Sequence, residues 1–85
     1  MLNLEIIAPD RLVYEGEAEI ATLPGSKGPF QVLPQHAGII SSLSRGKIQY
    51  RLHGREFEVM ISGGVAEVLK DRITVLVEEV IEEPK

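Results

Sequence analysis

The chain has 85 residues, a formal net charge of −4 and an apolar fraction of 44%, values typical of one small globular domain. Lys and Arg number 9 against 13 Asp and Glu, without a basic run, which disfavours nucleic-acid binding through phosphate neutralisation. The absence of cysteine excludes disulfides, thiolate metal sites and a cysteine nucleophile.

The first half of the chain alternates apolar and polar residues in short runs, a pattern typical of strands. Residues 2–8 form the first predicted strand, with Leu2, Leu4 and Ile6 on one face. A break at Pro9 ends this strand. Four more short strands are predicted at residues 11–15, 17–23, 30–33 and 39–43, with Gly16 separating the first two.

The second half shows the clearest alternation, in two runs around Ile48 and Val59 that a turn at His53-Gly54-Arg55 joins into a hairpin. Between Val65 and Glu83 there is neither Gly nor Pro, and the apolar spacing there also fits a helix. The many β-branched residues and a possible turn at Lys70-Asp71 favour two further strands. Nine short strands predict an all-β sandwich or barrel.

Residues 23–40 hold three prolines and three glycines, so the backbone must turn repeatedly around a very short strand. Loops held on a rigid scaffold often carry contacts with partners, although ordinary connecting loops are the alternative on composition alone. The segment from Glu78 to Lys85 contains four glutamates and is predicted to leave the body of the domain.

No constellation of catalytic or metal-binding residues is evident in the sequence. The two histidines, His36 and His53, lie on different turns without a third ligand at a metal-like spacing. Paired glutamates at alternate positions share the solvent face of a strand, and the glycine-rich segments lack the spacing of a phosphate loop. We therefore predict no catalytic, cofactor or metal site, and a binding or assembly module rather than an enzyme.

Five segments, in this order and spacing, resemble one known family. They are LEIIAPDR at residues 4–11, LPGSKGPFQVLPQHA at 23–37, LSRG at 43–46, ISGGVAEV at 61–68 and ITVL at 73–76. Together they resemble the N-terminal β-sandwich domain of the epsilon subunit of bacterial and chloroplast F-type ATP synthase.

The resemblance implies a small β-sandwich of two antiparallel five-stranded sheets over residues 1–78, followed by an acidic tail at 79–85. It also implies a non-catalytic rotor subunit in the central stalk, at the cytoplasmic face of a bacterial plasma membrane. The implied partners are the gamma subunit, the c-ring and, through gamma, the catalytic F1 core, without nucleic acid or direct membrane insertion. The alternative is a stand-alone β-sandwich module that binds a protein or another ligand.

The resemblance also implies two groups of contact residues. The implied gamma contacts are Val13, Tyr14, Ala37 and Ile39. The implied c-ring contacts are Ser26, Lys27, Gly28, Pro29, Phe30 and His36. Family members commonly read E-G-E-[L/F]-G-[V/I]-L-P-G-H-A-P in this region, and here Pro29 takes the place of the second acidic residue, Gln31 and Gln35 of glycines, and Gly38 of a proline.

Most family members continue into a C-terminal helical hairpin, which carries the inhibitory and ATP-sensing roles of the family. This sequence ends at Lys85 without such a hairpin. We therefore expect a short form that assembles the rotor without inhibiting ATP hydrolysis by an extended helix and without binding ATP.

Overall fold

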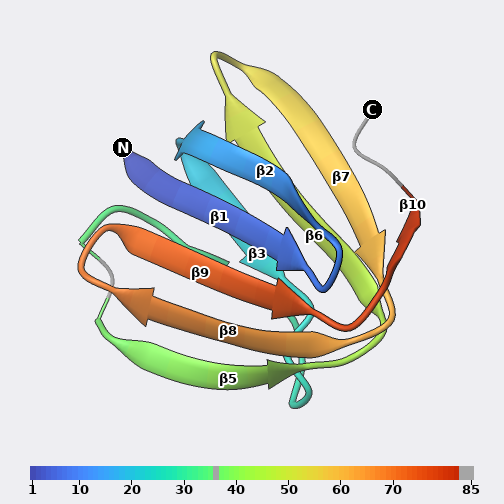
Figure 1. The fold of residues 1–85 in the computed structure, drawn as a ribbon. Coiled ribbons are helices and arrows are strands. Elements are labelled where there is room, and N and C mark those ends of the chain that lie inside the picture. Colours follow the sequence, from blue (N-terminus) through green and yellow to red (C-terminus); the bar gives the residue numbers. More distant parts are fainter. Residues whose placement is uncertain (36, 83–85) are drawn as a thin grey trace.

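The alternation of apolar and polar residues becomes two packed sheets in the computed structural model, which describes residues 1–35 and 37–82 (Figure 1). Its ten strands are β1 (Leu2–Ala8), β2 (Arg11–Ala18), β3 (Ile20–Leu23), β4 (Phe30–Val32), β5 (Ile39–Leu43), β6 (Gly46–Leu52), β7 (Arg55–Ile61), β8 (Gly64–Leu69), β9 (Arg72–Val77) and β10 (Val80–Glu82). Sheet 1 has the order β2-β1-β9-β8-β5, and sheet 2 has the order β10-β7-β6-β3-β4.

The predicted all-β sandwich of two five-stranded sheets is confirmed, and one pairing differs from the prediction. Strands β1 and β9 lie side by side and parallel, so sheet 1 is mixed, whereas sheet 2 is antiparallel throughout. A parallel pair needs a long crossover between its strands. Here the seven intervening strands provide that connection, which no local sequence pattern reveals.

The core lies between the two sheets and consists of the inward-facing side chains of both. It comprises Leu2, Leu4, Ile6, Ala8, Ala18, Ala21, Leu23, Val32, Leu43, Ile48, Tyr50, Val59, Ile61, Ala66, Val68, Ile73, Val75 and Val77. Within the described part of the chain, the side chains that form this core are hydrophobic, and the Tyr50 hydroxyl is the one polar side-chain group among them. No buried polar side-chain atom in these residues lacks a hydrogen-bond partner. Burial of apolar surface therefore provides the main driving force for folding.

Gly16 lies inside β2 and does not end a strand, contrary to the prediction. A Cβ atom at this position would lie 2.7 Å from the Tyr14 hydroxyl oxygen, so the missing side chain makes room for the Tyr14 ring. The strand continues to Ala18, and the chain passes to sheet 2 at Glu19, where the Glu19 N–H donates to the Arg51 carbonyl oxygen at 2.7 Å. A glycine in a strand can thus mark a close approach instead of a turn.

The strand interpretation of residues 65–77 is confirmed, and the helical alternative is wrong. Strands β8 and β9 form a hairpin whose turn contains Lys70, with a φ of 57°, and Asp71. No helix among residues 1–35 and 37–82 is long and apolar enough to cross a membrane.

The prediction that the acidic segment leaves the domain is wrong for residues 80–82. Val80 pairs with Ile61 of β7, and its side chain packs against the core, so β10 forms one edge of sheet 2. The Glu78 N–H donates to the Gly63 carbonyl oxygen at 2.9 Å, and the Ser62 N–H donates to the Glu79 carbonyl oxygen at 3.0 Å. These backbone contacts hold the segment in place although its glutamate side chains face solvent.

Gly64 provides a test of how closely β8 and β9 pack. A Cβ atom at Gly64 would overlap the carbonyl oxygen of Leu76, which belongs to the backbone and cannot turn away as a side chain could. We expect Gly64→Ala to lower the free energy of unfolding by about 2–4 kcal/mol, as is usual for overpacking and strand distortion. Urea denaturation measures this change.

The matched control for this prediction is Gly54→Ala, in the turn of the β6–β7 hairpin. Gly54 has a φ of 75° and open space around it, so an added methyl group meets no neighbouring atom. Its expected cost is about 1 kcal/mol, for the left-handed backbone alone. Equal losses in the two variants would contradict the proposed close approach.

Candidate functional site

The loop between β3 and β4 is attached to β5, the edge strand of sheet 1 (Figure 1). The Ser26 N–H donates to the Ser42 carbonyl oxygen at 3.0 Å, and the Ser44 N–H donates to the Pro24 carbonyl oxygen at 2.8 Å. The Ser42 hydroxyl donates to Ser26 Oγ at 2.8 Å. A loop that begins in sheet 2 is therefore fixed to sheet 1 by backbone and side-chain hydrogen bonds.

Four of the predicted c-ring contact residues, Ser26, Lys27, Gly28 and Pro29, are exposed on this loop. Phe30, the first residue of β4, is half-buried and packs against the core, so it anchors the end of the loop to the core. At the tip of the loop, the Gly28 N–H donates a hydrogen bond to the Gly25 carbonyl oxygen at 3.0 Å and closes a turn. His36 lies outside the described residues.

A shallow hollow of about 560 Å³ lies between this loop and β5. Residues 25–28, Phe30 and residues 39–42 line it, and we call it the Lys27 hollow after its one ionisable lining residue. Ile40 projects beside it with 74% of its surface exposed. The structure thus brings Ile39, predicted as a gamma contact, together with the loop predicted to meet the c-ring.

The four predicted gamma contacts are spread between the two edges of sheet 1. Val13 and Tyr14 belong to β2 and Ile39 belongs to β5, and these strands form opposite edges of sheet 1. Four inter-strand steps of about 4.8 Å separate the two edges by roughly 19 Å. Ala37 is exposed in the loop that precedes β5.

The loop between β4 and β5, which crosses from sheet 2 to sheet 1, is tied down through Asp71. The Gln35 N–H donates to Asp71 Oδ1 at 2.7 Å, while the Asp71 carbonyl oxygen accepts a hydrogen bond from the Asn3 N–H at 2.7 Å. Gln35 adopts a φ of 67°, a conformation that glycine takes more easily than glutamine. The hydrogen bond to Asp71 helps to hold Gln35 in this conformation.

Tyr14 serves mainly to pack the sandwich. Its ring centroid lies 4.5 Å from that of Tyr50, which in turn lies 5.3 Å from the centroid of Phe57. The Tyr14 hydroxyl donates to the Glu17 carbonyl oxygen at 2.8 Å. The three rings connect β2 of sheet 1 to β6 and β7 of sheet 2, so a change at Tyr14 affects folding as well as any contact with a partner.

Burial raises the pKa of both tyrosines in this stack. The pKa of Tyr50 rises to about 12, through burial first and the neighbouring Tyr14 second. The pKa of Tyr14 is also raised, by burial and then by Glu17. Both shifts favour the neutral phenol in the folded state.

The raised pKa of Tyr50 predicts a loss of stability at alkaline pH. The unfolded chain releases the Tyr50 proton near pH 10, whereas the folded chain holds it to about pH 12. Between these values the unfolded state binds fewer protons, so the free energy of unfolding falls as the pH rises, by about 2 kcal/mol. Urea denaturation at pH 9, 10, 11 and 12 measures the change.

Tyr50→Phe removes this titration and serves as the control. The variant should lose less stability than the wild type over the same pH interval. Parallel pH profiles for the two proteins would show that Tyr50 does not titrate with the expected difference between the folded and unfolded states.

The outer face of sheet 2 is polar and internally paired. Arg51 Nε lies 3.2 Å from Glu19 Oε1, and Lys47 Nζ lies 3.5 Å from Glu58 Oε1. The Gln49 side-chain amide also donates to Glu58 at 2.9 Å. These paired polar side chains suit a face that is in contact with water.

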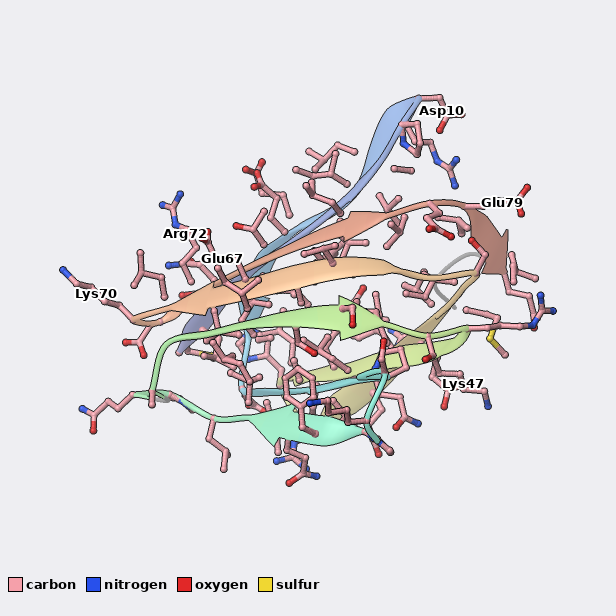
Figure 2. The ribbon with its side chains drawn as sticks, turned by 90° about the horizontal axis from the view of Figure 1, so that it is seen from below. Asp10, Lys47, Glu67, Lys70, Arg72 and Glu79 are labelled. Carbon is pink, nitrogen blue, oxygen red and sulfur yellow. The ribbon has the colours of Figure 1, made fainter. Side chains whose placement is uncertain are left out.

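The outer face of sheet 1 carries exposed apolar side chains across four strands. In register they are Leu12 on β2, Ile7 on β1, Leu76 on β9 and Val65 on β8. Leu12, Leu76 and Val65 are each about half exposed. No pattern in the sequence predicts this row, because its members are distant in the chain and only the register of the strands aligns them. Figure 2 shows the edge of the sandwich, with Lys70 and Arg72 near one end and Asp10 and Glu79 near the other.

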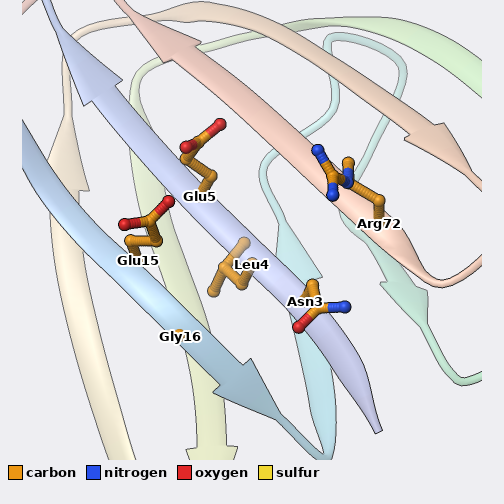
Figure 3. A pocket seen from close by; sticks show the side chains of 6 residues that line it. All are labelled: Asn3, Leu4, Glu5, Glu15, Gly16 and Arg72. Carbon is orange, nitrogen blue, oxygen red and sulfur yellow. The ribbon is translucent and has the colours of Figure 1, made fainter.

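A second hollow, of about 150 Å³, lies on the outer face of sheet 1 (Figure 3). Glu5 and Glu15 face each other across β1 and β2, and Arg72 lies across β1 on β9. Asn3, Leu4 and Gly16 complete the lining. No group of three or more histidine, aspartate, glutamate or cysteine side chains in the described ranges is arranged to hold a metal ion.

Comparisons with known proteins find a matching family model and similar sequences. The sequence profile described as "ATP synthase, Delta/Epsilon chain, beta-sandwich domain" matches residues 1–83. The ATP synthase epsilon chain of Nitratidesulfovibrio vulgaris is 42% identical over 77 residues, which are 91% of this chain and 58% of the relative. That of Koribacter versatilis is 43% identical over 76 residues, 89% of this chain and 54% of the relative.

A solved structure agrees with the fold. A chain in the Euglena gracilis mitochondrial ATP synthase, in a structure of OSCP, F1 and the c-ring, superimposes with a TM-score of 0.87 at 22% identity. The match covers 94% of this chain and 52% of that chain. This chain therefore spans little more than half the length of the relatives it matches.

Proposed function

The chain belongs to the family of ATP synthase delta/epsilon β-sandwich domains, and on this premise we propose that it acts as a rotor subunit of an F-type ATP synthase. In this role it links the gamma subunit to the c-ring and helps to couple proton transport to ATP synthesis. It contributes no catalytic group of its own and reaches the F1 core through gamma. The observation that carries the proposal is the family match over residues 1–83, which includes both shaped loops.

We also propose where the assembled subunit acts, at the cytoplasmic face of a bacterial plasma membrane. The curated bacterial relatives, which are named as ATP synthase epsilon chains, support this location. The stand-alone binding module has no comparable support, since both sequence comparisons lead to ATP synthase subunits.

The proposed contacts lie on the two shaped loops and at the two edges of sheet 1. The β3–β4 loop, with Ser26, Lys27, Gly28, Pro29 and Phe30, remains the proposed c-ring contact together with His36. The exposed residues Ala37 and Ile39 remain proposed gamma contacts, as do Val13 and Tyr14 at the other edge of sheet 1. The hydrogen bonds between the loop and β5 support a contact role, because a preorganised loop loses little conformational entropy on docking.

Affinity capture tests the proposed function directly. The tagged chain, expressed in its own organism, is expected to co-purify gamma and the c-ring from detergent-solubilised membranes. Mass spectrometry identifies the captured subunits, and an unrelated tagged β-sandwich protein controls for background. Capture of neither subunit from membranes that contain an active ATP synthase would contradict the proposal.

Ile39 provides a specific test of the gamma contact. Because 37% of its surface is exposed, Ile39→Asp should leave the domain folded while it places an unpaired charge in the contact. We expect the affinity for purified gamma to fall at least tenfold, as is usual when a buried interface charge lacks a partner. Calorimetry measures the affinity, and thermal unfolding verifies the fold.

The control for Ile39→Asp is Ile81→Asp, which introduces the same charge at an isoleucine that is also 37% exposed, on β10 of the other sheet. Its affinity for gamma should stay close to that of the wild type. If Ile39→Asp also binds like the wild type, Ile39 is not part of the gamma contact.

A further inference from the structure

The Lys27 hollow has a chemical character that differs from the rest of this acidic protein. Among its lining residues, Lys27 is the one that carries a charge, on a chain whose formal net charge is −4. The other lining groups are serine hydroxyls, glycines and apolar side chains. A positive charge thus stands alone at the mouth of a partly apolar hollow.

The Lys27 charge is not neutralised within the described part of the chain. Lys47 and Arg51 each lie within 4 Å of a glutamate oxygen, whereas Lys27 forms no ion pair with residues 1–35 or 37–82. Lys27 also lies at the exposed tip of the β3–β4 loop. The ammonium group is therefore available to an external anion.

Apolar surface adjoins this charge. Ile40 exposes 74% of its surface on β5, and the half-buried Phe30 ring forms part of the lining. An exposed isoleucine beside a hollow is a favourable position for a partner's apolar side chain. The hydrogen bonds between Ser26 and Ser42 keep the charged and apolar parts in a fixed relation.

We propose that the Lys27 hollow binds an acidic loop of a partner protein, in which a carboxylate pairs with Lys27 and an adjoining apolar side chain packs against Ile40. The inference rests on the proposed function, in which this loop faces the c-ring. The inference adds the sign of the partner's charge to that function. A segment that is complementary to Lys27 must be negatively charged. Lys27 is accordingly a specificity-determining residue of this contact.

The organism's own c-ring, purified in detergent, is the probe for the test. Binding of the full chain to the immobilised c-ring, in the presence of gamma, is measured by biolayer interferometry. We expect Lys27→Glu to weaken binding at least tenfold, because it replaces an attraction with a repulsion, and Lys27→Gln to have an intermediate effect. Added salt should weaken wild-type binding and reduce the difference between wild type and Lys27→Gln.

Arg55→Glu is the matched control, since it changes the net charge by the same amount. Arg55 lies at the tip of the β6–β7 hairpin, where it pairs with Leu52. The β3–β4 loop is near the other end of β6, since a Cβ atom added at Gly46 would lie 2.8 Å from Pro24 Cβ. This variant should bind within twofold of the wild type. Ile40→Ser tests the apolar part and should weaken binding about fivefold while the melting temperature stays unchanged.

The outcomes separate the two proposals. If the wild type binds the c-ring and Lys27→Glu binds equally well or better, the acidic-loop inference is wrong and the proposed function stands. If Lys27→Glu and Arg55→Glu lose affinity equally, net charge and not the hollow controls binding, which also overturns the inference. If the wild type binds neither gamma nor the c-ring, the proposed function fails and the inference fails with it.

Discussion

The exclusion of water from the space between the two sheets is the constraint on which the rest of the structure depends. Alternate residues of the strands face this space, and within the described residues the buried side chains are hydrophobic. A chain of this size buries only about 60–65% of its unfolded surface, so the core has little apolar area to spare. The strands must therefore keep their register, since a slip of one residue would turn the apolar side chains of a strand toward water.

That requirement makes the sandwich a rigid support for its loops. The β3–β4 loop starts in sheet 2, forms hydrogen bonds with the β5 edge of sheet 1 through Pro24 and Ser26, and returns to sheet 2 at Phe30. The β4–β5 loop is held by the hydrogen bond between Gln35 and Asp71, from the turn of the β8–β9 hairpin. Both loops are thus tied to strands other than those they connect. This arrangement suits a protein that presents a shaped surface to a partner, because the conformational cost of ordering the loops is met during folding.

The two outer faces of the sandwich differ in character. Sheet 2 presents pairs such as Arg51 with Glu19, whose charges are satisfied within the chain. Sheet 1 presents an apolar row that includes Leu12 and Leu76, and at its β5 edge the exposed Ile40. Surface charge pairs of this kind add little to stability, but they keep a sheet face wetted and disfavour association. Contacts with other proteins are therefore better suited to sheet 1 and its edge than to the outer face of sheet 2.

The sequence by itself determined the all-β class, most strand positions and the two shaped loops. Alternation with period two is a local property, and prolines and glycines fix turns through their own backbone preferences. The resemblance carried by motifs such as ISGGVAEV at residues 61–68 also identified the family from order and spacing alone. Tertiary structure alone decided which distant residues meet. It paired β1 with β9 in parallel, placed Val13 and Ile39 at opposite edges of sheet 1, and gathered Ile39 with Lys27 around one hollow. Local patterns do not encode such neighbours, because strand order follows from how the whole chain buries its apolar faces together.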